Sequence, residues 1–249
     1  MRIIISPAKK MKTDTDLLDY YHLPQQIKET EILLSYLKNL TYGEAKAIWK
    51  CNDEIAALNY ERIQKMDLYR NLTPAILSYE GIQYQYIAPR IFKIEEFSYI
   101  ETHLRIMSGF YGILRPFDGV VPYRLEMQAK LQGSELNSLY KFWNRKLAEQ
   151  LFSESSCIVN LASKEYSRCI SDYLDSSIRF ITCVFGEKIG EKVVEKGTQV
   201  KMARGEMVRF MAEKQIKSVE EIKKFNRLNY VFGEDLSNEN KYVFIKEGK

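Results

Sequence analysis

Short apolar runs rich in β-branched residues most constrain what this chain can fold into. Residues 2–6, 157–161 and 178–185 each carry such a run, bounded by polar or turn-forming residues. Runs of this length predict buried strands. Segments with apolar residues at helical spacing lie between them, and the clearest is 136–152. Strands and helices therefore alternate, although only in part.

This partial alternation predicts an α+β (mixed α/β) fold, in which a mixed sheet is surrounded by helices. The 249 residues suffice for one large domain or two small ones. No stretch rich in Pro, Gly or Ser divides the chain, so we predict a single compact domain over residues 1–249. Within it we expect three helices between residues 25 and 66, with a turn at Thr41–Gly43, and a short strand at Ala75–Leu77.

The chain lacks the motifs of metal and nucleotide-cofactor sites. Its four cysteines form no C-x-x-C pair, and it has only two histidines, so a zinc cluster is not expected. No G-x-G-x-x-G follows a predicted strand, and no G-x-x-x-x-G-K-[ST] occurs. We therefore predict no cofactor and no metal, with the cysteines as reduced thiols.

Two further features bear on where the protein acts. The longest apolar runs are far shorter than the ~20 residues that span a bilayer, and the first residues do not resemble a signal peptide. We expect a cytoplasmic protein that does not bind membranes, with a monomer as the favoured state.

The positive charge of the chain is concentrated in one segment. Residues 197–229 hold eight Lys or Arg and four Glu, an excess equal to the formal net charge of +4 for the whole chain. Such a segment suggests a phosphate or polyanion partner. The alternative is an ordinary solvated helix in which acidic and basic side chains pair four residues apart.

Four polar segments could together form a cationic cleft. Two follow predicted strands, where ligand-binding loops of α/β proteins collect, and the second of these also begins a helix, whose free N–H groups attract anions. The others are a pair of Gly/Pro turns within 108–127 and the start of the basic segment. The residues that we predict to bind phosphate or nucleic acid are Ser6, Lys9, Lys10, Arg115, Tyr123, Arg124, Ser163, Tyr166, Lys201, Arg204 and Arg209.

Simpler roles exist for several of these residues. Arg115 and Asp118 could merely pin a turn, and Ser163 could serve only as a helix cap. Gly205 costs about 1 kcal/mol inside a helix relative to Ala, which suggests that a backbone or a ligand approaches it closely.

Taken together, the segments resemble a known family. Residues 5–9 (Ile-Ser-Pro-Ala-Lys), 109–116, 122–127 (Pro-Tyr-Arg-Leu-Glu-Met), 160–166 and 201–207 are similar in order and spacing to the YaaA family of bacterial peroxide-stress proteins. The similarity spans nearly the whole chain.

The resemblance implies a cytoplasmic single-domain protein with a positively charged cleft. It also implies a role in the hydrogen peroxide response, where the family is associated with limiting unincorporated iron and oxidative damage, and with DNA binding. A helix-hairpin-helix-like element attributed to the family would fall within residues 31–66, joined near Thr41–Gly43. The sequence offers no set of iron ligands, so we do not expect this chain to sequester iron directly.

Three functions stay open on the sequence alone. The favoured one is a stress protein that binds DNA through phosphate contacts, with Tyr123 and Tyr166 stacking on bases. The second is an enzyme acting on a nucleotide-like or phosphorylated substrate. Its candidate catalytic residues are Lys9, as nucleophile or electrophile, and Glu126 or Glu165, as general base. The third is a scaffold protein that uses the same cleft.

Overall fold

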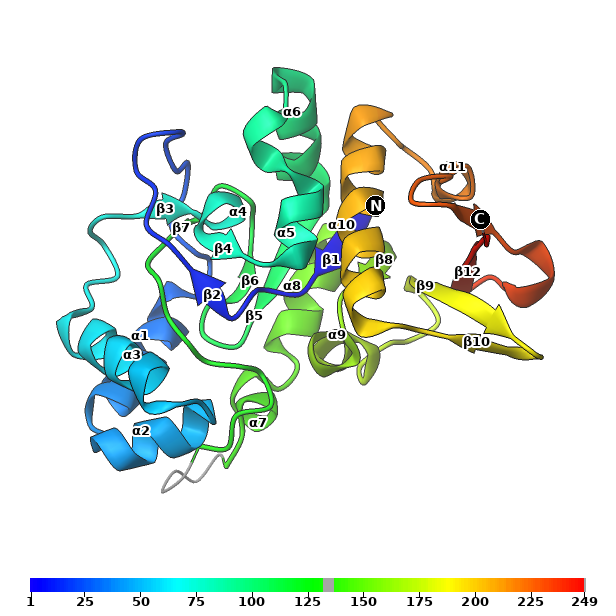
Figure 1. Cartoon of the computed structure of the whole chain (residues 1–249). Helices are drawn as coiled ribbons and strands as arrows, with labels where there is room; N and C mark the ends of the chain where they lie inside the picture. The colour runs from blue at the N-terminus through cyan, green and yellow to red at the C-terminus, as the bar shows by residue number, and fades with distance from the viewer. Residues whose placement is uncertain (132–136, 249) are drawn as a thin grey trace.

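A mixed β-sheet forms the centre of the molecule. The computed structural model describes residues 1–131 and 137–248. In this part of the chain, eight strands pair in the order β11-β12-β9-β8-β1-β5-β6, with β10 added to β9 (Figure 1). The strands are β1 (Arg2–Ile5), β5 (Leu104–Ser108), β6 (Gly112–Leu114), β8 (Cys157–Leu161), β9 (Arg179–Ile189), β10 (Lys192–Val194), β11 (Tyr230–Phe232) and β12 (Lys241–Lys246).

The five inner strands are parallel, and this arrangement agrees with the predicted mixed sheet. β1 runs parallel to β5 and β8, and β9 runs parallel to β8 and β12, whereas β6, β10 and β11 are antiparallel to their neighbours. Ile3, Ile4 and Ile5 of β1 are fully buried. A central strand covered on both faces has a continuous apolar run instead of alternation, which explains the pattern at the start of the sequence.

Helices surround the sheet. The longest, α10 (Gly197–Glu213), packs against α5 (Ile82–Ile87), α6 (Ile94–His103) and β9. The pair α8 (Lys146–Glu154) and α9 (Lys164–Ser171) also pack together. Among the described helices, none is long and apolar enough to cross a membrane.

Three helices lie together at one end of the molecule, on the lower left of Figure 1. They are α1 (Ile27–Lys38), α2 (Tyr42–Trp49) and α3 (Asp53–Lys65). The expected turn at Thr41–Gly43 is wrong, because Thr41 caps α2 and Gly43 lies inside that helix. Thr41 forms a capping box with Glu44, which fixes the start of α2 at Tyr42.

Short elements complete the fold. Strand β2 (Lys10–Met11) pairs with β4 (Tyr79–Glu80), and β3 (Thr73–Pro74) pairs with β7 (Gly119–Val120). Further helical turns are α4 (Ala75–Ser78), α7 (Leu139–Trp143), α11 (Val219–Ile222), and the 3-10 turns Pro89–Ile91 and Glu234–Leu236.

Two expected elements differ from the structure. Ala75–Leu77 forms the first part of helix α4 and not a strand, since a three-residue apolar run fits either conformation once buried. The helix expected at 136–152, whose residue 136 lies outside the described residues, is divided into α7 and α8. The break is at Asn144, whose φ of 43° and ψ of −131° cannot continue a helix.

Candidate functional site

A cavity of about 420 Å³ opens at the carboxyl ends of β1 and β8. These strands are parallel neighbours with Ile5 opposite Leu161, so the segments that follow them emerge side by side. Ligand sites of α/β sheets commonly form at this edge. The described residues that line the cavity are Ser6–Lys10, Glu80–Tyr84, Tyr123–Glu126, Ser163, Glu165, Tyr166, Lys201 and Arg204.

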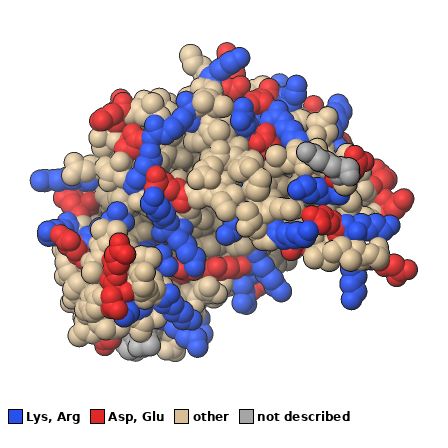
Figure 2. All heavy atoms as spheres, viewed as in Figure 1, with Lys and Arg blue, Asp and Glu red and all other residues tan. Residues whose placement is uncertain are grey.

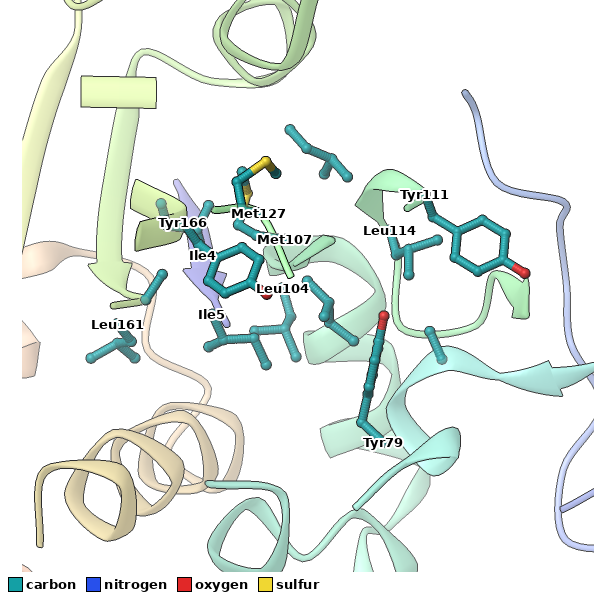
Figure 3. Close-up of a cluster of buried hydrophobic side chains, with 14 of the residues drawn as sticks. Ile4, Ile5, Tyr79, Leu104, Met107, Tyr111, Leu114, Met127, Leu161 and Tyr166 are labelled. Atoms are coloured by element: carbon teal, nitrogen blue, oxygen red, sulfur yellow. The ribbon is translucent and has the colours of Figure 1, made fainter. Parts of the chain in front are cut away.

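The core beneath the cavity holds these segments in place. Figure 3 shows the cluster of buried side chains that includes Ile4, Ile5, Leu161 and Tyr166, contributed by β1, β8 and α9. Tyr166 is 6% exposed, so its ring belongs mainly to this core. Rigid strands and a packed core therefore position the loops that carry the polar groups.

Two serines tie the segments after β1 and β8 together. The backbone N–H of Ser163 donates to Ser6 Oγ at 2.8 Å, and Ser6 Oγ lies 3.3 Å from Ser163 Oγ. Ser163 stands at the N-cap position of α9, as predicted, but its side chain makes no capping hydrogen bond. The protein itself therefore uses one of the N–H groups that we had expected to face an anion.

Cationic side chains lie at two depths in the cavity. The side chains of Lys9 and Lys10 are 65% and 79% exposed at the mouth, whereas that of Arg124 is only 11% exposed. The Nε atoms of Arg124 and Arg204 are buried and have no hydrogen-bond partner among the described residues. Burial also lowers the pKa of the Arg204 guanidinium from its usual value. On the face shown in Figure 2, Lys and Arg side chains form a band near β2, with acidic side chains beside them.

Three carboxylates accompany these cations. Glu126 lies between two of them, with Oε2 at 2.8 Å from Lys9 Nζ and Oε1 at 3.5 Å from Arg124 Nη2. Glu80 pairs with Lys10 at 2.9 Å. Burial, and then the charge of Glu126, raise the pKa of the Glu165 carboxyl, which accepts a hydrogen bond from the Gln128 backbone N–H at 3.2 Å.

The tyrosines of the site are buried and held by hydrogen bonds. The Tyr123 hydroxyl lies 2.6 Å from Ser108 Oγ and 2.8 Å from the Tyr79 hydroxyl. Burial raises the pKa of Tyr123 to about 12, so its hydroxyl is protonated at neutral pH. Tyr123 is 5% exposed, which leaves little ring surface for the base stacking that the sequence suggested. That role stays a prediction for both Tyr123 and Tyr166.

Two of the predicted binding residues do not line the cavity. Arg115 pairs with Asp118 at 2.9 Å, and Asp118 also accepts a hydrogen bond from the Arg115 backbone N–H, so the pair pins a turn. Arg209 pairs with Glu213 at 2.7 Å on the same helix. All the other predicted binding residues line the cavity, and so do the candidate catalytic residues Lys9, Glu126 and Glu165.

The basic segment is divided between two roles. Lys201 and Arg204 line the cavity, whereas Arg227 pairs with Glu206 and Glu213, and Lys223 pairs with Glu220. The ion pairs confirm the second interpretation for part of the segment, whereas phosphate binding by Lys201 and Arg204 stays a prediction.

One part of the cavity wall was not predicted from the sequence. Residues Glu80–Tyr84 form this part of the wall, and they run from the end of β4 into the first turn of α5. An ideal Cβ on Gly205 would lie 2.2 Å from the Gln83 carbonyl oxygen, so this glycine lets α10 approach the backbone of α5. The close approach expected at Gly205 is thus made by a neighbouring backbone.

The described residues contain no group of three or more His, Cys, Asp or Glu side chains that could hold a metal ion. The four cysteines are free. Burial raises the pKa of Cys169 and of Cys183 to about 12, which keeps both thiols protonated and therefore poorly reactive.

Comparison with known proteins identifies the family. A family model described as peroxide stress protein YaaA matches residues 1–236. A UPF0246 protein of Lachnoclostridium phytofermentans is 57% identical over 246 residues, which cover 99% of this chain and 96% of that protein. UPF0246 proteins of Agathobacter rectalis and Pediococcus pentosaceus are 54% and 53% identical, and in each case the match covers at least 98% of both chains. The chain therefore belongs to the peroxide stress protein YaaA family.

Proposed function

We propose that this protein acts in the peroxide stress response by binding DNA through the cavity and the basic surface at its mouth. The observation that carries the proposal is the convergence of five Lys and Arg side chains, from three segments far apart in the sequence, on one cavity. These side chains are Lys9, Lys10, Arg124, Lys201 and Arg204.

The unpartnered arginine nitrogens strengthen the case for an anionic ligand. A buried polar group without a hydrogen bond is costly, and the Nε atoms of Arg124 and Arg204 are in this condition. Phosphate oxygens form strong, charge-assisted hydrogen bonds with guanidinium groups. Phosphate contacts supply most of the affinity of proteins that bind DNA without sequence preference.

Fluorescence anisotropy with a labelled DNA duplex tests this proposal through a matched pair of variants. Arg204→Gln removes a cation of the cavity, whereas Arg209→Gln removes one from the same helix that is paired with Glu213. We expect Arg204→Gln to weaken binding about tenfold, equally for unrelated sequences, and Arg209→Gln to change it little. Equal effects of the two variants, or no binding by the wild type at low salt, would refute the proposal.

One observation favours an enzyme as the second candidate. Lys9 Nζ and Glu126 Oε2 are 2.8 Å apart at a partly enclosed cavity, which is the proximity that a catalytic lysine and carboxylate require. Incubation with nucleotides and phosphorylated metabolites, followed by mass spectrometry of products, tests it. Product formation should be lost in Lys9→Ala and in Glu126→Gln, and turnover that survives both changes would exclude this role.

A further inference from the structure

The cavity is too small for a double helix. Its volume of about 420 Å³ lies within the range of about 300–1,000 Å³ that small-molecule sites occupy. The major groove of B-DNA alone is about 12 Å wide, so a duplex can lie across the mouth but cannot enter. Only a part of a DNA strand close to the size of one nucleotide fits inside.

The charged side chains of the cavity are arranged by depth. Lys9 and Lys10 at the mouth are largely exposed, whereas the side chains of Arg124 and Glu126 are 11% and 19% exposed. Exposed lysines suit the phosphates of a passing backbone, because an ammonium group is a compact charge on a flexible stem. The inner carboxylates, those of Glu126 and Glu165, do not suit phosphate. They repel its negative charge and accept hydrogen bonds from N–H groups.

A nucleobase offers the partners that the interior requires. Its amino and ring N–H groups can donate to Glu126 and Glu165, while the guanidinium groups of Arg124 and Arg204 can bind the phosphate of the same nucleotide. The partly exposed side chain of Ile82 adds apolar surface to the same cavity. Enzymes that read a base removed from the duplex use this combination of hydrogen bonds and apolar contact.

We propose that the cavity accepts one unpaired nucleotide of DNA, with the lysines of the mouth on the flanking phosphates, the inner arginines on the phosphate of that nucleotide and the inner carboxylates on its base. This inference rests on the proposed DNA binding and adds to it a preference for DNA in which a nucleotide is already unpaired. Such a preference follows because a paired nucleotide must first be unstacked and unpaired, at a free-energy cost that an unpaired one avoids.

The test compares two duplexes that differ only in one bulged nucleotide, which carries the fluorescent base 2-aminopurine. We expect the wild type to bind the bulged duplex about tenfold more tightly than the paired one, and the 2-aminopurine signal to change as binding saturates. Equal affinity for the two duplexes, with no change in the signal, would overturn the inference and leave the proposed DNA binding intact.

Two variants separate occupation of the cavity from general phosphate binding. Ile82→Trp fills the cavity and should abolish the preference for the bulge, whereas Gln85→Trp, on the exposed side of the same helix, should keep it. Glu126→Gln removes an acceptor and a negative charge. It should lose most of the preference for the bulged duplex. A preference retained in both Ile82→Trp and Glu126→Gln contradicts the inference.

Titration with free dAMP tests whether the cavity binds a nucleotide within a DNA strand or a free nucleotide. Under the inference, dAMP competes only weakly with the bulged duplex, because it lacks the flanking phosphates that the lysines contact. Binding of dAMP to the wild type but not to Ile82→Trp, without any binding of DNA, would assign the cavity to a free nucleotide and overturn both the inference and the proposed function.

Discussion

Gly205 sets the distance between two helices at the wall of the cavity. An added Cβ would meet the Gln83 carbonyl oxygen at 2.2 Å and Tyr86 Cβ at 2.8 Å. The first of these atoms belongs to the backbone, so no side-chain rotation can relieve the contact. The glycine therefore positions α10, and with it Lys201 and Arg204, against α5.

Substitution of this glycine should destabilise the protein. We expect Gly205→Ala to lower the free energy of unfolding by about 1–3 kcal/mol, because overpacking outweighs the helix propensity that alanine adds. Gly43 is the matched control, since it also lies in a helix and an added Cβ meets nothing within 4 Å. Gly43→Ala should raise stability by up to about 1 kcal/mol. Urea unfolding measures both, and a stabilised Gly205→Ala variant would contradict this account.

Asp118 gives the protein a pH-dependent stability. Burial raises the pKa of its carboxyl to about 6, against the opposing hydrogen bonds and charge of Arg115. The folded state then binds more protons than the unfolded state between about pH 4 and pH 6. The contribution of Asp118 to stability is thus fully present below pH 4 and is lost as the pH rises through 6.

Replacement by asparagine should remove this dependence. The difference in unfolding free energy between wild type and Asp118→Asn should decrease by about 2 kcal/mol from pH 4 to pH 7. Urea unfolding across this range measures it. A difference that stays constant would show that the carboxyl titrates at its ordinary pKa, and one that grows with pH would show a lowered pKa; either result would contradict this account.

At the scale of elements, the stability of the protein can be raised by substitution at a helix end whose backbone angles suit glycine. Lys50 ends α2 in the left-handed conformation, with φ of 45° and ψ of 55°, where glycine carries no steric penalty. We expect Lys50→Gly to raise the free energy of unfolding by about 1 kcal/mol. Lys214 ends α10 with a right-handed φ of −91°, so Lys214→Gly should not stabilise the protein. Urea unfolding that ranks the two in the opposite order would contradict this reasoning.

Elements were predictable where local pattern and burial agree. The strands beginning at Arg2 and Cys157 combine β-branched residues with clear boundaries, and both occur as expected. The apolar run at Ala75–Leu77 was misassigned because burial alone does not distinguish a strand from one helical turn. The break at Asn144 was invisible because the apolar spacing continues through it, while the backbone angles there are set by tertiary packing.

At the scale of the whole molecule, the sequence identified those parts of the cavity that carry charge. Lys9 and Arg124 could be found because cations stand beside a predicted strand end and a predicted turn, and Arg204 because it lies in the basic segment. Glu80–Tyr84 could not, since this wall is brought to the cavity by the pairing of β4 with β2 and by the contact of α5 with α10. Arg115 and Arg209 show the opposite limit, because a sequence does not reveal which cations the fold places outside the cavity.

The number of cations at the cavity also limits how strongly salt can affect DNA binding. Each phosphate contact adds about −0.9 to the slope of log affinity against log salt concentration. Because five Lys and Arg side chains line the cavity among the described residues, contacts made there alone predict a slope no steeper than about −4.5. Anisotropy titrations at several salt concentrations give the slope for the wild type and for Arg204→Gln, which should be shallower by about 0.9.

The absolute slope then tells where the rest of the DNA lies. A slope no steeper than this limit is the result expected when the cavity and its mouth make all the phosphate contacts. A much steeper slope would require basic groups elsewhere, and the helices α1–α3 are the first region to examine, because the sequence resemblance predicts a hairpin element within residues 31–66. Arg209→Gln serves again as control, since its ion pair with Glu213 predicts an unchanged slope, and a slope that becomes shallower in that variant would place DNA on the outer face of α10 instead.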